Sequence, residues 1–231
     1  MVALTGAGVS VESGIPDFRS EGGVWTRFSP WEYGTLTCFL TNPAKSWELF
    51  RELGRTLQGK QPNPAHVALA ALEQSGRLAG VVTQNVDGLH QAAGSRNVIE
   101  LHGDQQHLQC IDCGRLTLAT PEHLEPGPVP TCEACGRALK PNVVLFEEMV
   151  RHLPAIEDLL AGCDVLIVAG TSAEVVPAAM LPTQVLSRGG SVLEFNRERT
   201  LLTARGLGPR GALILGLAGT TLPLVESRVQ G

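Results

Sequence analysis

Residues 1–19 read MVALTGAGVSVESGIPDFR, a short apolar stretch that runs into a loop with glycine at Gly6 and Gly8. A strand followed by a glycine-rich turn is typical of the first unit of a nucleotide-binding α/β fold, because glycine allows tight turning and close backbone approach. The complete G-x-G-x-x-G fingerprint needs a third glycine at position 11, where Val11 stands. The stretch therefore predicts a first strand and a binding loop, and a dinucleotide fits there, but the loop alone does not identify the ligand.

Further apolar runs follow the same pattern and predict a parallel sheet. They are AGVVT (79–83), NVVLF (142–146), DVLIVAG (164–170), SVLEF (191–195) and ALILG (212–216). Runs with little polar alternation indicate strands that are buried on both faces. Helical spacing separates them in AKSWELFRELGRTL (44–57), NPAHVALAALEQSGR (63–77), PAIEDLLAGC (154–163) and PAAMLPTQVLSR (177–188). We therefore expect the α/β class with a doubly wound parallel sheet.

The segment 103–140 interrupts this pattern and is rich in Pro, Gly and Cys. It holds two C-x-x-C pairs, Cys110 with Cys113 and Cys132 with Cys135, and each pair is followed by glycine. Four thiolates at this spacing suit one tetrahedral Zn²⁺ and fill its coordination sphere, so we expect a structural ion in a small zinc-binding insertion domain. Two disulfides or a redox pair are the alternatives.

Composition limits the possible partners. The 231 residues are 43% hydrophobic and carry a formal net charge of -5, and the few Lys and Arg of the cysteine segment alternate with Asp and Glu. We therefore expect no direct nucleic-acid binding, which draws on clustered basic residues. No apolar run approaches the roughly 20 residues that span a bilayer, so we expect no membrane association and a cytoplasmic location.

Polar clusters stand where three of the predicted strands end. TQNVDGLH (83–90) follows the run AGVV, ELHGD (100–104) follows a further short run, NVI (97–99), and GTSAEVVPA (170–178) follows DVLIVA. In open α/β sheets, ligands bind beyond the carboxyl ends of the strands. Each cluster can have an ordinary structural reason, such as capping a turn, but together they predict one shared pocket.

The sequence resembles the sirtuin family of NAD-dependent protein-lysine deacylases, of bacterial or archaeal type. The resemblance rests on GAGVSVESGIPDFR (6–19), TQNVDGLHQAAG (83–94), LHG (101–103), the two cysteine pairs, KPNVVLF (140–146), GTS (170–172), VVPAA (175–179) and EFN (194–196). It implies a Rossmann-like NAD-binding domain from 1–30, 65–102 and 141–231. A helical module (31–64) and a zinc-ribbon module (103–140) would together form the small domain, with NAD and acyl-lysine meeting in the cleft between the two domains.

The resemblance also implies roles for individual residues. The positions expected to contact NAD are Gly6, Ala7, Gly8, Ser10, Glu12, Asp17, Phe18, Arg19, Trp25, Gln84, Asn85, Val86, Asp87, Gly170, Thr171, Ser172, Asn196 and Ala218. Those expected to be catalytic are His102 as general base, with Asn85 and Asp87 around the nicotinamide. Val144 and Phe146 would line an acyl tunnel, together with Phe50 and Leu53 on the helix of the small domain.

Phe50 and Leu53 also bear on the acyl group. Sirtuins that prefer succinyl-lysine place Tyr and Arg three residues apart on this helix, and the corresponding Phe50 and Leu53 cannot pair with a carboxylate. We therefore expect deacetylation, with O-acetyl-ADP-ribose, nicotinamide and free lysine as products, and acetyl-lysine proteins as substrates. In the alternative interpretation, Phe50 and Leu53 are ordinary core residues and the pocket is formed elsewhere, so that Arg51 or Arg55 turns into it and can pair with an acyl carboxylate.

Two other functions fit the same motifs. Mono-ADP-ribosyl transfer would use the same activated ribose carbon, and a non-catalytic NAD-sensing or interaction module would use only the binding site. The presence of His102 argues against the second, because a sensor needs no general base. One departure from the family is Glu147, which stands where glycine is usual.

Overall fold

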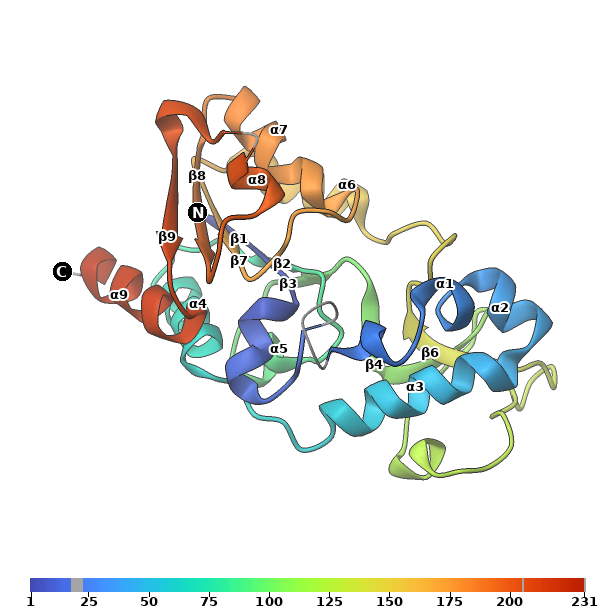
Figure 1. The fold of residues 1–231 in the computed structure, drawn as a ribbon. Helices are drawn as coiled ribbons and strands as arrows, with labels where there is room; N and C mark the ends of the chain where they lie inside the picture. The colour runs from blue at the N-terminus through green and yellow to red at the C-terminus, as the bar shows by residue number, and fades with distance from the viewer. Residues whose placement is uncertain (18–22, 205, 231) are drawn as a thin grey trace.

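The computed structural model describes residues 1–17, 23–204 and 206–230. Its larger sheet is fully parallel and has the strand order β3-β2-β1-β7-β8-β9 (Figure 1). The strands are β1 (Val2–Thr5), β2 (Val81–Thr83), β3 (Val98–Glu100), β7 (Val165–Ala169), β8 (Ser191–Asn196) and β9 (Gly211–Leu215). The order reverses beside β1, which is the switch point at which doubly wound sheets bind ligands. The predicted fold class is confirmed.

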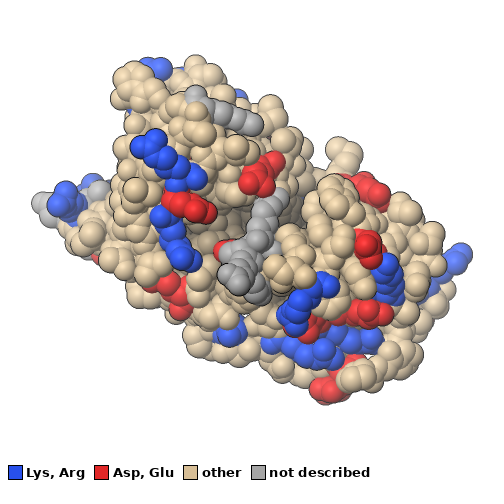
Figure 2. All heavy atoms as spheres, viewed as in Figure 1, with Lys and Arg blue, Asp and Glu red and all other residues tan. Residues whose placement is uncertain are grey.

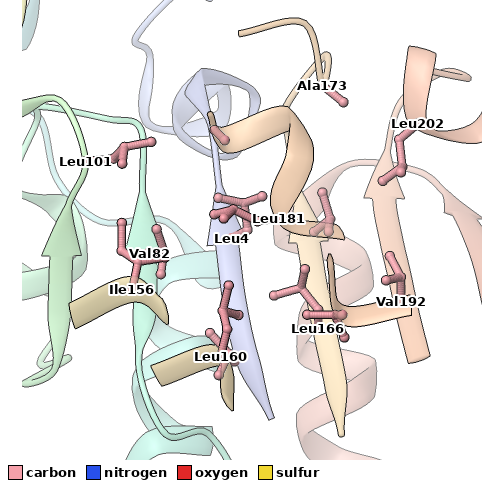
Figure 3. Packing of buried hydrophobic residues seen from close by; sticks show 14 of the residues in the cluster. Leu4, Val82, Leu101, Ile156, Leu160, Leu166, Ala173, Leu181, Val192 and Leu202 are labelled. Atoms are coloured by element: carbon pink, nitrogen blue, oxygen red, sulfur yellow. The ribbon is translucent and has the colours of Figure 1, made fainter. Parts of the chain in front are cut away.

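Successive residues of the central strands face opposite sides of this sheet, and helices cover both sides. Leu4 and Leu166 pack on one side against α6 (Leu153–Ala161) and α7 (Leu181–Ser187), as Figure 3 shows. Ala3 and Ile167 pack on the other side against α4 (Pro64–Gln74) and α9 (Ala218–Gln230). The apolar runs lack alternation because both sides are buried, as parallel sheets require.

A second, antiparallel sheet holds the cysteine segment. It consists of β5 (Leu116–Leu118), β4 (Gly103–Cys110) and β6 (Leu139–Val143) in that order. The prediction that the run NVVLF belongs to the parallel sheet is wrong. Only its first two residues, Asn142 and Val143, are in a strand, and that strand is β6. Apolar periodicity reports burial and does not say which sheet a strand joins.

The helical module packs on this small sheet. It contains α1 (Pro30–Tyr33), α2 (Leu36–Thr41) and α3 (Pro43–Leu57). Trp47 of α3 is buried and donates a hydrogen bond from its indole Nε1 to the carbonyl oxygen of Leu139, at 2.8 Å. Phe50 packs edge-on against Trp47, with ring centroids 5.7 Å apart. The Trp47–Leu139 hydrogen bond joins α3 to β6, two elements 92 residues apart in the sequence.

The remaining elements are short. They are α5 (Leu89–Ala92), α8 (Leu201–Ala204) and the 3₁₀ helices Ala7–Ser13, Val24–Thr26, Pro121–Leu124, Ala178–Met180 and Gly208–Arg210. Among the described helices, none has the length and apolarity needed to cross a bilayer. Strand β6 runs across the domain boundary expected between residues 140 and 141, and that division of the chain stays a prediction.

Candidate active site

A cavity of about 890 Å³ opens between the carboxyl ends of the parallel strands and the small sheet with α3. The space-filling view shows the molecule hollowed in this region (Figure 2). The predicted site residues that line it are Gly6, Ala7, Gly8, Asp17, Trp25, Phe50, Leu53, Gln84, Asn85, Val86, His102, Val144, Phe146, Gly170, Thr171, Ser172 and Asn196. Polar clusters from distant parts of the chain thus share one pocket.

Hydrogen bonds between the strand ends form the polar half of the cavity. The amide nitrogen of Gln84, just after β2, donates to the hydroxyl of Thr171, just after β7, at 3.0 Å. The amide of Asn196, at the end of β8, donates to the carbonyl oxygen of Thr171 at 2.9 Å. Three strands therefore hold one another's terminal side chains in place, so that these side chains are preorganised before a ligand enters.

The glycines of the first loop allow it to contact the loop after β7. The backbone N–H of Gly8 donates to the carbonyl oxygen of Gly170 at 2.8 Å. A Cβ atom on Gly8 would lie 2.8 Å from the Gly170 Cα, and one on Gly170 would lie 2.2 Å from the Val9 nitrogen. Gly170 also has φ near +62°, which favours glycine. In this structure the glycines bring the backbone of the first loop against the backbone of the loop after β7.

His102 lies in the turn between β3 and β4 and contacts both halves of the cavity. Its ring Nδ1 is 3.0 Å from the carbonyl oxygen of Gln84, and its own carbonyl oxygen accepts a hydrogen bond from the Val144 N–H at 2.8 Å. Burial lowers the pKa of His102 below its ordinary value, and the hydrogen bond to Gln84 partly opposes that shift. A neutral imidazole can accept a proton near pH 7.

Asn85 is held by a buried polar network behind the cavity. Its amide nitrogen donates to the Gly6 carbonyl oxygen at 3.2 Å and to the Ser10 hydroxyl oxygen at 3.1 Å. The Ser10 hydroxyl donates to Asp87 Oδ2 at 2.7 Å, and Asp87 Oδ1 accepts from the Leu89 N–H at 2.9 Å. Asp87 thereby fixes both the first loop and the start of α5.

Four described residues of the predicted cofactor set lie away from the cavity lining: Ser10, Glu12, Asp87 and Ala218. Glu12 Oε2 accepts a hydrogen bond from the Gly219 N–H at 2.6 Å, at the beginning of α9. Ala218, the first residue of α9, is buried in the core. Their contact with NAD stays a prediction. Phe18 and Arg19 lie outside the described residues.

The other half of the cavity is apolar and contains the four predicted tunnel residues, Phe50, Leu53, Val144 and Phe146. Arg51 and Arg55, the alternative acyl contacts, instead hydrogen bond to backbone of the cysteine segment. Arg51 Nη2 donates to the carbonyl oxygens of Gly127 and Pro128 at 2.9 and 3.0 Å, and Arg55 Nη2 donates to that of Leu124 at 2.6 Å. Neither arginine lines the cavity.

The four cysteines predicted to bind zinc come together at one point of the small sheet. The Sγ atoms of Cys110, Cys113, Cys132 and Cys135 all lie within 4.8 Å of one another. The Sγ–Sγ distances are 3.5 Å for Cys110–Cys135, 3.6 Å for Cys113–Cys132 and 3.8 Å for Cys113–Cys135. Zn–S bonds of about 2.3 Å in a tetrahedron put sulfurs roughly 3.8 Å apart. The cluster fits a structural zinc ion.

The comparisons with known proteins agree with this site. The family model described as "Sir2 family" matches residues 6–177. The chain belongs to the Sir2 family. It is 45% identical over 209 residues to "NAD-dependent protein deacylase 1" of Archaeoglobus fulgidus, covering 88% of this chain and 83% of that protein. It is 41% identical over 241 residues to "NAD-dependent protein deacylase" of Thermococcus kodakarensis, covering 99% and 90%.

A solved structure gives the same assignment. A mutant Sir2 homologue in complex with ADP-ribose superposes with a TM-score of 0.91 at 42% identity, covering 99% of this chain and 91% of that one. The sirtuin resemblance drawn from the motifs is therefore confirmed at the level of family and fold.

The structure of this Sir2 family chain adds residues that the sequence did not single out. Glu198, Arg199, Thr200, Leu201 and Ala204 line the polar end of the cavity. Their segment is anchored by Glu194 of β8, a fully buried carboxylate that accepts hydrogen bonds from the hydroxyls of Thr200 and Thr203. The signal was present in the sequence, since an acidic residue inside the apolar run SVLEF needs a buried partner.

Two buried histidines were also missed. His66 of α4 lies 3.4 Å from the Ser10 hydroxyl through Nε2, and its Nδ1 accepts from the Asn63 N–H at 3.3 Å. His90 lies beside it, with ring centroids 4.8 Å apart, and bonds Thr5 Oγ1 through Nε2 at 2.9 Å. The pKa of His90 is lowered to about 3, mainly because the ring is buried and to a smaller extent because His66 lies beside it. Both rings complete the polar network behind Asn85.

Proposed function

We propose that this chain is an NAD-dependent protein-lysine deacylase that moves an acetyl or other uncharged aliphatic acyl group from lysine to ADP-ribose. The observation that carries the proposal is the position of His102, which is bonded to Gln84 at the polar end of the cavity and to Val144 at the apolar end. A proton acceptor at the junction suits a reaction between a polar and an apolar substrate. The relatives named as NAD-dependent protein deacylases support it.

NAD is assigned to the polar end. The first loop, Gln84 and Asn85 after β2, and Thr171 and Asn196 would hold it there. A homologue in complex with ADP-ribose supports the choice of ligand. NAD supplies a ribose carbon that becomes electrophilic as nicotinamide departs. Because the strand-end side chains are held by one another, they orient this carbon with little rearrangement, and orientation is a large part of catalysis when the nucleophile is a weak amide oxygen.

The acyl-lysine is assigned to the apolar end. Phe50, Leu53, Val144 and Phe146 present hydrocarbon surface to the acyl chain and exclude water from the reacting atoms. His102 would then take a proton at Nε2 from a ribose hydroxyl, and this hydroxyl accepts the acyl group. Acyl-lysine, NAD and water give lysine, nicotinamide and O-acyl-ADP-ribose.

The cysteine cluster is assigned to structural zinc rather than to the reaction. Four sulfur ligands leave no open coordination position. Zinc would instead fix the small sheet on which α3 packs, and through α3 it would fix the position of Phe50.

The test is to incubate the purified protein with NAD and an acetyl-lysine peptide and to follow all products by mass spectrometry. Deacylase activity predicts equal amounts of free-lysine peptide, nicotinamide and O-acetyl-ADP-ribose. ADP-ribose attached to protein or peptide would instead indicate mono-ADP-ribosyl transfer. The absence of any nicotinamide release would indicate a sensing or interaction module. ADP-ribosyl transfer or the absence of nicotinamide release would overturn the proposal.

A further inference from the structure

Glu147 is an exposed carboxylate that lines the apolar end of the cavity, directly after Phe146. Hydrogen bonding to the side chain and backbone of Thr37 lowers the pKa of Glu147, so the group is ionised at neutral pH. It forms no ion pair with any residue of the described ranges. The rim of an otherwise apolar pocket therefore carries an uncompensated negative charge.

The position of this charge is fixed by the backbone on both sides. The Phe146 N–H donates to the Gly34 carbonyl oxygen at 3.0 Å, and the Leu36 N–H donates to the Phe146 carbonyl oxygen at 3.0 Å. Glu147 Oε2 then accepts from the Thr37 N–H at 2.9 Å, at the beginning of α2. Glu147 has φ near +76°, a conformation that glutamate seldom adopts, which turns the chain at this point. A partner would meet a carboxylate that is already ordered.

The neighbouring acidic side chain is paired, and the basic side chain of the lining lies at the other end of the cavity. Glu148 forms an ion pair with the buried Lys140, with 3.1 Å between Oε2 and Nζ. Apart from His102, the basic side chain among the described lining residues is that of Arg199. It follows Glu198 at the polar end of the cavity. No described arginine or lysine of the lining therefore competes for Glu147, and the electrostatic complement of this rim is a cation.

An aromatic surface adjoins the same point. Trp31 is 70% exposed, and its ring centroid is 4.8 Å from that of Phe146, so a large apolar side chain lies open beside the pocket. Lysine and arginine bury their aliphatic stems on such surfaces while the charged group stays in water or pairs with an anion. Trp31 and Glu147 together offer both contacts.

We infer that Glu147 and Trp31 form a subsite for a lysine or arginine next to the acylated lysine of the protein substrate. The inference rests on the proposed function, because it places the acyl-lysine side chain in the apolar end. Its backbone must then cross the rim, and neighbouring residues, about 3.3–3.6 Å apart along an extended chain, come within reach of Glu147. The enzyme would prefer basic over acidic sequence contexts.

The test uses three acetyl-lysine peptides that differ only at the residues flanking the target, which are arginine, alanine or glutamate. For the wild-type protein we expect kcat/KM to be roughly five- to tenfold higher for the arginine than for the glutamate peptide at low salt, mainly through KM, and this ratio to shrink at high salt. Glu147→Gln should bring the ratio close to one, because the amide oxygen still accepts from Thr37 while the charge is gone.

Two controls separate charge at this site from other effects. Glu157→Gln on the exposed face of α6 removes the same charge away from the cavity and should leave the ratio as in wild type. Unchanged thermal unfolding of Glu147→Gln would exclude a fold defect. Equal kcat/KM for arginine and glutamate peptides, with good turnover of the alanine peptide, would overturn this inference alone. Turnover of none of the three would overturn the proposed function and this inference with it.

Discussion

The carbonyl oxygen of Gln84 determines which nitrogen of His102 can act as a base. A carbonyl oxygen only accepts hydrogen bonds, so the 3.0 Å contact with Nδ1 requires the proton to be on Nδ1 and leaves the lone pair on Nε2. The ring is thus held in one tautomer and one orientation by the residue that follows β2. This relationship makes the role of His102 testable.

His102→Ala should reduce deacylation by roughly 10²- to 10⁴-fold, the usual contribution of a general base. NAD binding and the circular dichroism spectrum should be retained, because the ring packs beside the cofactor region without forming the core. Single-turnover rates with an acetyl-lysine peptide, together with NAD titration, give both quantities. Near-normal turnover by a folded variant would rule out the proposed base.

The pH dependence of kcat/KM should reflect the lowered pKa of His102, whose main cause is burial. The base must be neutral, and a lowered pKa keeps it neutral further into the acid range. Activity should therefore be constant from pH 8 down to about 6.5, the ordinary histidine value, and decline only below it. The measurement is kcat/KM across pH 5–8 with zinc content checked at each point. An acid limb with its midpoint above pH 7 would contradict this assignment.

Removal of zinc should lower both stability and activity, because it weakens the small sheet that holds the metal. Cys132→Ser is expected to lose bound metal and lower the thermal stability, because a structural zinc ion is coupled to folding. Activity should decline with it as α3 and Phe50 lose their support. Cys163→Ser, outside the cluster, is the matched control and should keep the metal. Metal analysis that found an active wild-type protein without zinc would disprove the assignment.

The acyl preference should follow the apolar lining. Acetyl- and butyryl-lysine peptides should be turned over well, and the succinyl peptide at least tenfold less efficiently, about 1.4 kcal/mol in the transition state, because a buried carboxylate would lack a partner. Arg51 and Arg55 cannot supply one while they bond the cysteine segment. Measuring kcat/KM on one peptide sequence with each acyl group gives the comparison. A preference for succinyl would reverse this conclusion.

The double variant Phe50→Tyr with Leu53→Arg extends that prediction. It places a hydroxyl and a cation at the two tunnel positions and should shift the succinyl-to-acetyl ratio upward. Arg51→Ala serves as the control, since it removes a charge from the same helix at a position that does not line the cavity.

His90 should make stability depend on pH. Its pKa is about 3 in the folded protein and about 6.5 when unfolded, so above pH 6.5 both states are neutral and below it only the unfolded state takes up the proton. Stability should therefore fall as pH decreases from 6.5 toward 3, by about 1 kcal/mol between pH 7 and 5.5. Urea unfolding at these pH values is the measurement. His90→Gln should reduce the slope, and an unchanged slope would assign the effect to other groups.

Local sequence determined the strands of the parallel sheet, the cysteine ligands and the polar strand ends. Unbroken apolar runs identify strands buried on both sides, and spacing within C-x-x-C fixes which thiols can share an ion, because both are properties of neighbouring residues. The motif order then indicated the family. These features need no knowledge of how distant segments pack.

The tertiary structure decided which partner each polar side chain takes. Ser10 meets Asp87 across 77 positions, Glu12 meets Gly219 across 207, and Glu147 meets Thr37 across 110. The run that ends in Phe146 joined the small sheet for the same reason. Hydrogen bonds act over about 3 Å, so a contact between remote residues exists only after hydrophobic packing has brought their strands and helices together, and no local pattern records it.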